Sequence, residues 1–173
     1  MDTYYTIEEK YLQAMEQVCY GESPKALNLL NAIIEDDPFY ARAHYQIGKL
    51  YYYELKDYKT AGYHFKTCVA LEPLFPDVYF HFLHLVVFMN LENEVDQIIL
   101  KAFQIPGINK ASIFELQALF YEKNKKWANA LEAYNLAFIE VTNKKQLETI
   151  EESIVRVMEK IKKTSPYKYE YSE

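Results

Sequence analysis

Amphipathic helical segments recur along this chain at an almost constant interval, and this interval constrains the fold more than any other feature. The recurring units begin near residues 7, 41, 76 and 111, so the steps between them are 34, 35 and 35 residues. Proline lies at several of the boundaries, where it favours the first turn of a helix because it has no backbone N–H to donate. A fixed period over about 130 residues predicts a stack of similar helical units.

The composition favours helices over strands. Half of the residues are hydrophobic and 16% are aromatic, which is enough to form a core. Only 4 Gly and 6 Pro are present, too few for the frequent tight turns of a β-sandwich or β-barrel. We therefore expect an all-α fold. The predicted helices cover residues 5–20, 24–35, 38–55, 58–71, 76–89, 91–104, 110–123, 126–140 and 145–163.

Large, small and aromatic residues keep the same spacing in several of these units. The unit over residues 41–75 carries Ile47-Gly48, Tyr51 and Pro73 in one frame, with one extra residue in its turn. This pattern resembles the tetratricopeptide repeat (TPR), a helix–turn–helix unit of about 34 residues. The resemblance implies an all-α, right-handed superhelical α-solenoid of antiparallel helix pairs. Small residues such as Gly48 are expected to let two paired helices approach closely.

The units predict one repeat domain over residues 1–163. Its repeats lie near residues 7–40, 41–75, 76–110 and 111–142, and a capping helix covers residues 145–163. This helix has an apolar stripe of Leu147, Ile150, Ile154, Val157 and Ile161 and an opposite polar face of Glu148, Glu151, Glu152, Arg156 and Lys160. We expect the stripe to cover the exposed end of the stack. Residues 164–173, which are rich in Tyr, are expected to form a flexible tail.

The charge and hydropathy of the chain argue against several kinds of partner. Its net charge is −6, and an acidic surface repels the phosphates of nucleic acids. The longest apolar stretch, residues 78–89, spans 12 residues, whereas a membrane-spanning helix needs about 20. No secretory signal is visible in the first residues. We therefore expect a cytoplasmic protein that binds neither nucleic acid nor membrane.

No motif of a known catalytic or phosphate-binding site occurs in the chain, so we expect no enzymatic activity and no cofactor. His81 and His84 come closest to a metal site, because side chains three residues apart lie near each other on a helix. A metal site also needs a third ligand, and the sequence offers only distant ones. Cys19 and Cys68 lie in different repeats and are expected to be reduced thiols. We predict no metal site.

The resemblance to TPR proteins also implies a binding surface, because repeats of this family commonly bind proteins or peptides with the first helix of each pair. The corresponding positions of the second and third units carry Arg42, Tyr45, Lys49, Tyr52, Tyr53, Phe80, His84 and Phe88. Four of these residues are assigned as apolar anchors, namely Tyr45, Tyr52, Phe80 and Phe88. Arg42 and Lys49 are expected to bind an acidic group. The fourth unit would contribute Ser112, Glu115, Leu119, Glu122 and Lys123. The predicted function is that of a non-enzymatic scaffold or adaptor for a protein or peptide ligand.

Other interpretations fit the same residues. The groove can be filled by the chain's own tail or by another copy, which would make the protein a self-assembling structural protein and a homo-oligomer. The aromatic residues can equally pack inside the solenoid, since aromatic stripes at helical spacing usually belong to a core. A small helical metal-binding protein or enzyme, based on His81, His84 and scattered acidic residues, has the weakest support.

Overall fold

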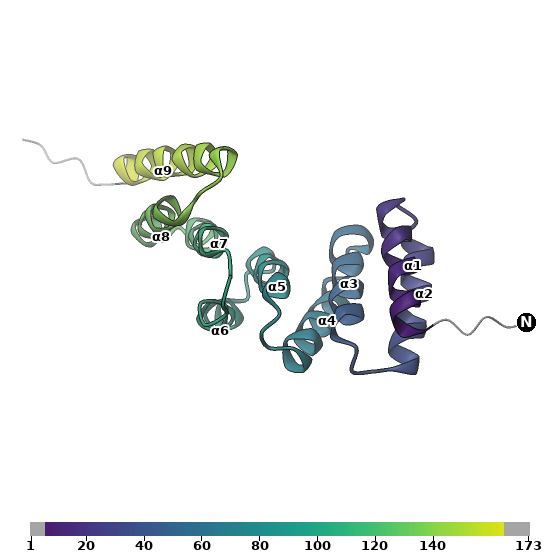
Figure 1. The fold of residues 1–173 in the computed structure, drawn as a ribbon. Helices are drawn as coiled ribbons and strands as arrows, with labels where there is room; N and C mark the ends of the chain where they lie inside the picture. Colours follow the sequence, from purple (N-terminus) through teal and green to yellow (C-terminus); the bar gives the residue numbers. More distant parts are fainter. Residues whose placement is uncertain (1–5, 165–173) are drawn as a thin grey trace, which may run out of the picture. The chain divides into compact units, whose positions relative to one another are not determined.

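A computed structural model describes residues 6–164, which form two compact units, one up to Leu85 and one from Val86 onward (Figure 1). The helices are α1 (Ile7–Cys19), α2 (Ser23–Asp36), α3 (Ala41–Lys49), η1 (Leu50–Leu55), α4 (Tyr58–Leu71), α5 (Pro76–Phe88), α6 (Glu92–Ala102), α7 (Lys110–Lys123), α8 (Trp127–Glu140) and α9 (Lys144–Thr164). Residues 6–164 contain no β-strand, and none of their helices is both long and apolar enough to span a membrane. A single domain over residues 1–163 stays a prediction, and the predicted tail beyond Thr164 lies outside the described residues.

Eight of the nine predicted helices are confirmed, with ends that lie within two residues of the predicted ones. The prediction of one α-helix over residues 38–55 was wrong. The helix α3 begins only at Ala41, because residues 37–40 form a turn in which Asp37 accepts the N–H of Phe39 at 3.0 Å. From Leu50 to Leu55 the chain forms a π-helix, η1, whose N–H groups bond to carbonyl groups five residues earlier.

The backbone of the turns confirms the repeat period. One residue in each turn between paired helices is left-handed: Gly21 (φ 74°), Lys56 (58°), Asn90 (58°) and Lys125 (58°). These positions are separated by 35, 34 and 35 residues. In three of the turns the following N–H bonds to a carbonyl group five residues earlier, over 2.9 Å: Glu22 to Gln17, Leu91 to Val86 and Lys126 to Tyr121. In the second turn Asp57 bonds instead to Tyr51, six residues earlier. The π-helix therefore accommodates the extra residue of this unit.

Close contact between paired helices holds the first unit together. A Cβ atom on Gly48 of α3 would lie 2.7 Å from the ring of Phe65 in α4, which is fully buried. The predicted role of Gly48 in helix approach is thus confirmed. The main apolar cluster of this unit consists of Ala14, Ala26, Leu30, Ile33, Ala43, Ile47 and Leu50.

The second unit has its own core between α7, α8 and α9. Its buried cluster consists of Ala118, Ala130, Ala133, Tyr134 and Val157. The predicted apolar stripe of α9 packs as expected, because Ile150 and Val157 are fully buried and Ile154 and Ile161 pack against the cluster. The helix α9 therefore covers α8 and adds the last layer of this unit.

Candidate functional site

The π-helix places three consecutive tyrosines, Tyr51 to Tyr53, against two different helices of the first unit. A π-helix has more residues per turn than an α-helix, so successive side chains point in more similar directions. Tyr52 and Tyr53 both face α5, and their ring centres lie 4.5 Å apart. Tyr51 stacks on His64 of α4 at 6.1 Å.

Tyr52 and Tyr53 each form a hydrogen bond with a histidine of α5. The phenol oxygen of Tyr52 lies 2.5 Å from Nδ1 of His84, and that of Tyr53 lies 2.8 Å from Nδ1 of His81. A phenol O–H is a strong donor and an unprotonated imidazole nitrogen a strong acceptor, so we assign the phenols as donors. The proton of each neutral imidazole then lies on Nε2. These two bonds connect η1 to α5 at neighbouring points.

Burial keeps the four groups of this network neutral near pH 7. Burial, assisted by the positive charge of Lys49, lowers the pKa of His81 to about 4. Burial also lowers the pKa of His84 and raises the pKa of Tyr52 to about 12. The pKa of Tyr53 is raised for the same reason. Each phenol therefore keeps the proton that it donates, and each imidazole keeps its acceptor nitrogen.

Two cations lie on the same side of α3. Arg42, Tyr45 and Lys49 are three and four residues apart, which places them along one face of the helix. The ammonium group of Lys49 lies 5.2 Å from the centre of the Tyr45 ring. Within residues 6–164, neither Arg42 nor Lys49 forms an ion pair. Both cations can therefore bind an acidic group from outside the chain.

The aromatic residues predicted to line the groove differ in exposure. Phe80 of α5 is 36% exposed, whereas Tyr45 and Tyr52 are only 6% and 5% exposed. Tyr45 is buried because it packs edge-on against Phe75, with ring centres 5.0 Å apart. Tyr52 is buried because it bonds to His84. The rings of Tyr45 and Tyr52 therefore lie beneath the exposed residues of the predicted groove and are not accessible to a partner. Tyr53 and His84 are half-buried.

Phe88 belongs to the second unit, where it is 51% exposed. Lys123 of α7 lies 5.9 Å from the centre of this ring and donates to the carbonyl oxygens of Val87 and Phe88, both at 2.9 Å. A cation at this place stabilises the partial negative charge at the end of α5. The grouping of Phe88 with Phe80 and His84 in one groove stays a prediction.

The other two histidines form a buried pair. Nδ1 of His44 lies 3.0 Å from Nδ1 of His64, and Nε2 of His44 lies 3.0 Å from the carbonyl oxygen of Pro38. Because a carbonyl oxygen can only accept, Nε2 of His44 carries the proton and its Nδ1 accepts from His64. Burial and the neighbouring His44 lower the pKa of His64 to about 4. Within residues 6–164 no three His, Cys, Asp or Glu side chains come together as a metal site would require.

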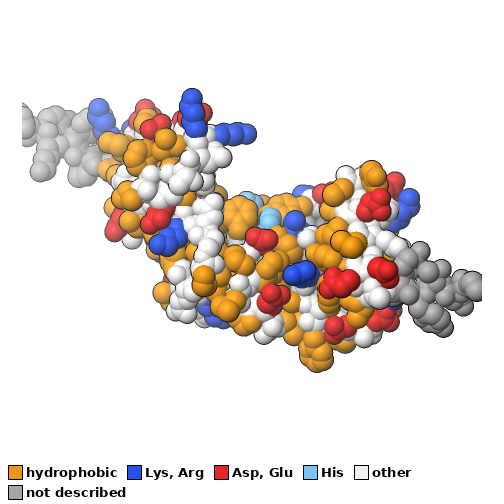
Figure 2. All heavy atoms as spheres, in the orientation of Figure 1, with side chains coloured by type: hydrophobic (Ala, Val, Ile, Leu, Met, Phe, Trp, Pro, Cys, Tyr) orange, Lys and Arg blue, Asp and Glu red, His pale blue; other side chains and the backbone are white. Residues whose placement is uncertain are grey.

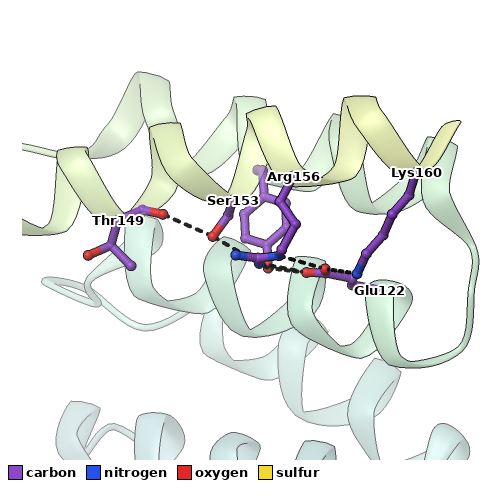
Figure 3. A network of polar contacts seen from close by, with 6 residues as sticks. Glu122, Thr149, Ser153, Arg156 and Lys160 are labelled. Atoms are coloured by element: carbon purple, nitrogen blue, oxygen red, sulfur yellow. Dashed lines mark hydrogen bonds and ion pairs between the residues drawn. The ribbon is translucent and has the colours of Figure 1, made fainter. Parts of the chain in front are cut away.

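Glu122 of α7 is the centre of a polar network in the second unit (Figure 3). Arg156 donates to both of its carboxylate oxygens at 2.9 Å, Lys160 donates at 2.6 Å, and the Tyr134 hydroxyl donates at 2.9 Å. Glu122 is 8% exposed. The hydrogen bond from Arg156, helped by those from Lys160 and Tyr134, lowers the pKa of Glu122 to about 2 although burial opposes this change. The charged carboxylate of Glu122 in α7 therefore binds two cations of α9.

The helix α9 contacts several positions that the sequence assigned to the groove of the fourth unit. Gln146 donates to Ser112 at 3.1 Å and to Glu115 at 2.9 Å, and Glu122 binds Arg156. In the second unit these positions contact the chain's own helix. The placement of Arg156 and Lys160 on a face opposite the packed stripe was wrong, because both cations reach the buried carboxylate of Glu122.

Sequence reasoning missed both polar networks, although each left a signal. The extra residue in the second unit indicated a local irregularity, and one inserted residue in a helix is commonly accommodated as a π-helix. The signal for the second network was Glu122, a glutamate next to apolar positions near the end of α7. Arg156 and Lys160, four residues apart on α9, supply the matching charges.

No protein-family model and no curated protein sequence matches the chain. Several solved structures resemble it. PilF from Pseudomonas aeruginosa is 18% identical with a TM-score of 0.76, over 91% of this chain and 69% of that chain. MamA from Desulfovibrio magneticus RS-1 is 16% identical with a TM-score of 0.68, over 92% and 97%. YrrB, a TPR protein with an unusual peptide-binding site, is 13% identical with a TM-score of 0.68, over 89% and 87%.

This likeness establishes the fold. The chain has an all-α, TPR-like solenoid fold of helix pairs, and both the predicted resemblance and the predicted fold class are confirmed. At these sequence identities the likeness shows the fold alone.

Proposed function

We propose that this chain is a non-enzymatic protein-interaction module that binds a peptide or protein segment. The binding surface would be the α3–α5 face, defined by Arg42, Lys49, Tyr53, Phe80 and His84. The proposal places the protein in the cytoplasm, with neither nucleic acid nor membrane as a partner. The peptide-binding site of YrrB, which has a similar fold, supports a peptide ligand.

One observation carries this proposal. Arg42 and Lys49 form no ion pair within the described part of the chain, and they lie on the side of α3 that carries the aromatic network. Phe80 is exposed on the neighbouring helix. Arginine and aromatic side chains are enriched in the energetically important part of protein interfaces. The ligand class that fits this face is an acidic segment with an apolar side chain.

The tyrosine–histidine bonds support such a surface by keeping it rigid. Tyr52 and Tyr53 hold η1 to α5, so the surface needs little ordering when a partner binds. A preformed surface binds more tightly than a flexible one because less conformational entropy is lost. The buried rings of Tyr45 and Tyr52 would act as supports, and Phe80 and Tyr53 as contacts.

Photo-crosslinking tests this proposal directly. Phe80 is replaced by a photoreactive benzoylphenylalanine, and the same residue is placed at exposed Phe39 as a matched control. We expect position 80, but not position 39, to crosslink a protein from the source lysate. The crosslink should weaken when Arg42→Ala and Lys49→Ala are added, and should persist with Lys59→Ala.

The other outcomes of the crosslinking experiment would contradict the proposal in different ways. A crosslink from position 80 to residues 165–173, or to a second copy, would support the self-assembling alternative instead. Equal crosslinking at positions 80 and 39 would reject the α3–α5 face as a specific surface. Circular dichroism melting curves of all variants would confirm that they are folded.

A further inference from the structure

A second surface lies on the outer side of α8 and α9 in the second unit. Phe138 of α8 is 42% exposed, and Val155 and Met158 of α9 are 57% and 55% exposed. Figure 2 shows hydrophobic side chains over these helices with acidic side chains beside them. The surface includes a shallow hollow, here named the α8–α9 groove, which is lined by Asn135, Phe138, Glu151, Ile154 and Val155.

The helix α9 carries more exposed apolar side chains than its packing against α7 and α8 uses. The apolar stripe of α9 is already used, since Ile150 and Val157 are fully buried against the rest of the unit. Val155 and Met158 lie outside that stripe and face solvent. An apolar patch rimmed by charged residues is typical of an interaction site.

A second hollow, here named the acidic rim, adjoins the α8–α9 groove on α9 and shares Glu151 and Val155 with it. The acidic rim is lined by Glu148, Glu151, Glu152, Val155, Arg156 and Glu159. Lys144 lies 3.9 Å from Glu148, but the other three glutamates form no ion pair within residues 6–164. The one cation of the acidic rim, Arg156, is bound to Glu122. The apolar groove therefore lies beside three carboxylates that form no ion pair within the described residues.

We propose that the α8–α9 groove binds an amphipathic helix of a partner protein that is rich in lysine or arginine. Apolar side chains of that helix enter between Phe138 and Val155, and its cations pair with Glu151, Glu152 and Glu159. Glu151 and Glu152 lie about two helical turns from Glu159 along α9, a spacing that a helix lying alongside can match with its own cations. This proposal is independent of the α3–α5 face.

Charge complementarity favours this occupant over the two that the chain itself could supply. A second copy placed symmetrically about Val155 brings Glu151 of each copy towards Glu159 of the other near the centre of the contact, whereas the attractive pairs of Glu148 with Lys162 lie farther from that centre. The net charge of −6 also opposes self-association. Residues 165–173 contain one Lys and two Glu, so this segment does not complement an acidic rim.

Two synthetic peptides of about 18 residues test the proposal with the full chain. Both have leucine on one helical face, and the rest is mainly lysine in one and glutamate in the other. Binding is measured by fluorescence anisotropy in low and in physiological salt. We expect the lysine peptide to bind with one-to-one stoichiometry, more weakly at higher salt because the ion pairs are screened. The glutamate peptide should not bind.

Two sets of variants locate the site. Phe138→Ala with Val155→Ala should weaken binding of the lysine peptide at least tenfold, and so should the triple variant Glu151→Gln, Glu152→Gln and Glu159→Gln. The matched control removes three exposed glutamates of the first unit, by Glu16→Gln, Glu35→Gln and Glu54→Gln, and should change affinity less than twofold. If the apolar double variant fails to fold, the comparison between the two triple glutamine variants tests the proposal.

Several results would overturn the proposal. Absence of lysine-peptide binding, equal binding of both peptides, or equal loss in the control triple variant would show that the groove is not a specific site. A dimer in sedimentation that Val155→Ala dissociates would assign the groove to a second copy. Binding that becomes at least tenfold tighter when the chain ends at Thr164 would assign it to the chain's own last residues.

Discussion

Gly48 of α3 packs so closely on Phe65 of α4 that a Cβ atom at residue 48 would lie only 2.7 Å from the Phe65 ring. This contact sets how closely α3 and α4 can approach in the first unit. The ring of Phe65 is fully buried and has no space to retreat. The close approach of these two helices therefore depends on the absence of one methyl group.

Gly48→Ala should destabilise the protein by about 1–3 kcal/mol, because a packed core absorbs an added methyl group only by shifting its neighbours. Urea unfolding followed by circular dichroism measures this loss. Gly62→Ala in α4 is the matched control, since its Cβ atom would make an ordinary contact of 3.7 Å with Leu85. There the better helix propensity of alanine should raise stability by about 0.5–1 kcal/mol. Equal effects of the two substitutions would contradict this account.

The histidines of the first unit should make stability depend on pH in the range where carboxylates remain charged. The pKa values of His64 and His81 are lowered to about 4, and the pKa of His84 is also lowered. In the unfolded chain these groups titrate near 6.5, so the unfolded state binds more protons as pH falls below that value. The contribution of the neutral histidines to the free energy of unfolding is complete above about pH 6.5 and is lost progressively as the pH falls towards 4.

Lowering the pH from 7.5 to 5.5 should therefore reduce the unfolding free energy by about 2 kcal/mol, a value discounted for partial exposure of the rings. Urea unfolding at both pH values measures the difference. The variant His81→Gln should show a smaller pH dependence than the wild type, because one of the titrating groups is gone. Identical unfolding free energies at pH 7.5 and 5.5 would rule out this role of the histidines.

Glu122 should stabilise the second unit in a different pH range. Its pKa is lowered to about 2, so its contribution is complete above the unfolded value near 4.5 and disappears as pH falls from 4.5 towards 2. Glu122→Gln should cost on the order of 2–3 kcal/mol at pH 7, because the ion pairs with Arg156 and Lys160 are lost. The cost should shrink at pH 3. Exposed Glu151→Gln is the control and should change stability by less than about 0.5 kcal/mol.

The sequence was sufficient to predict the fold because its signals are local and repeated. The predicted units are 34, 35 and 35 residues apart, and the left-handed turn residues from Gly21 to Lys125 keep the same period within one residue, with steps of 35, 34 and 35. The apolar stripe of α9 packs as its helical spacing indicates. These features depend on helix period and turn chemistry, which neighbouring residues determine.

The candidate site could not be predicted in the same way, because exposure depends on contacts distant in the sequence. Tyr45 and Tyr52 have the helical spacing of surface residues in the repeat frame, yet Phe75 and His84 cover them. Arg156 falls on the polar side of a helical projection, but its long side chain reaches a carboxylate 34 positions away in the chain. Such pairings arise only when helices have packed, so a one-dimensional pattern does not contain them.

Tyr53→Phe tests whether the phenol donates to His81. Removing this hydroxyl should lower stability by about 1–2 kcal/mol, because it leaves Nδ1 of His81 buried without a donor. In wild-type protein, long-range proton–nitrogen NMR spectra at pH 7 should show Nε2 of His81 and His84 protonated and Nδ1 unprotonated. The control is Tyr63→Phe, at a residue that is 63% exposed, and it should leave stability within about 0.5 kcal/mol of the wild type. A proton on Nδ1 of His81 in the wild type would reverse the donor assignment, and an unchanged stability in Tyr53→Phe would show that this bond does not hold η1 to α5.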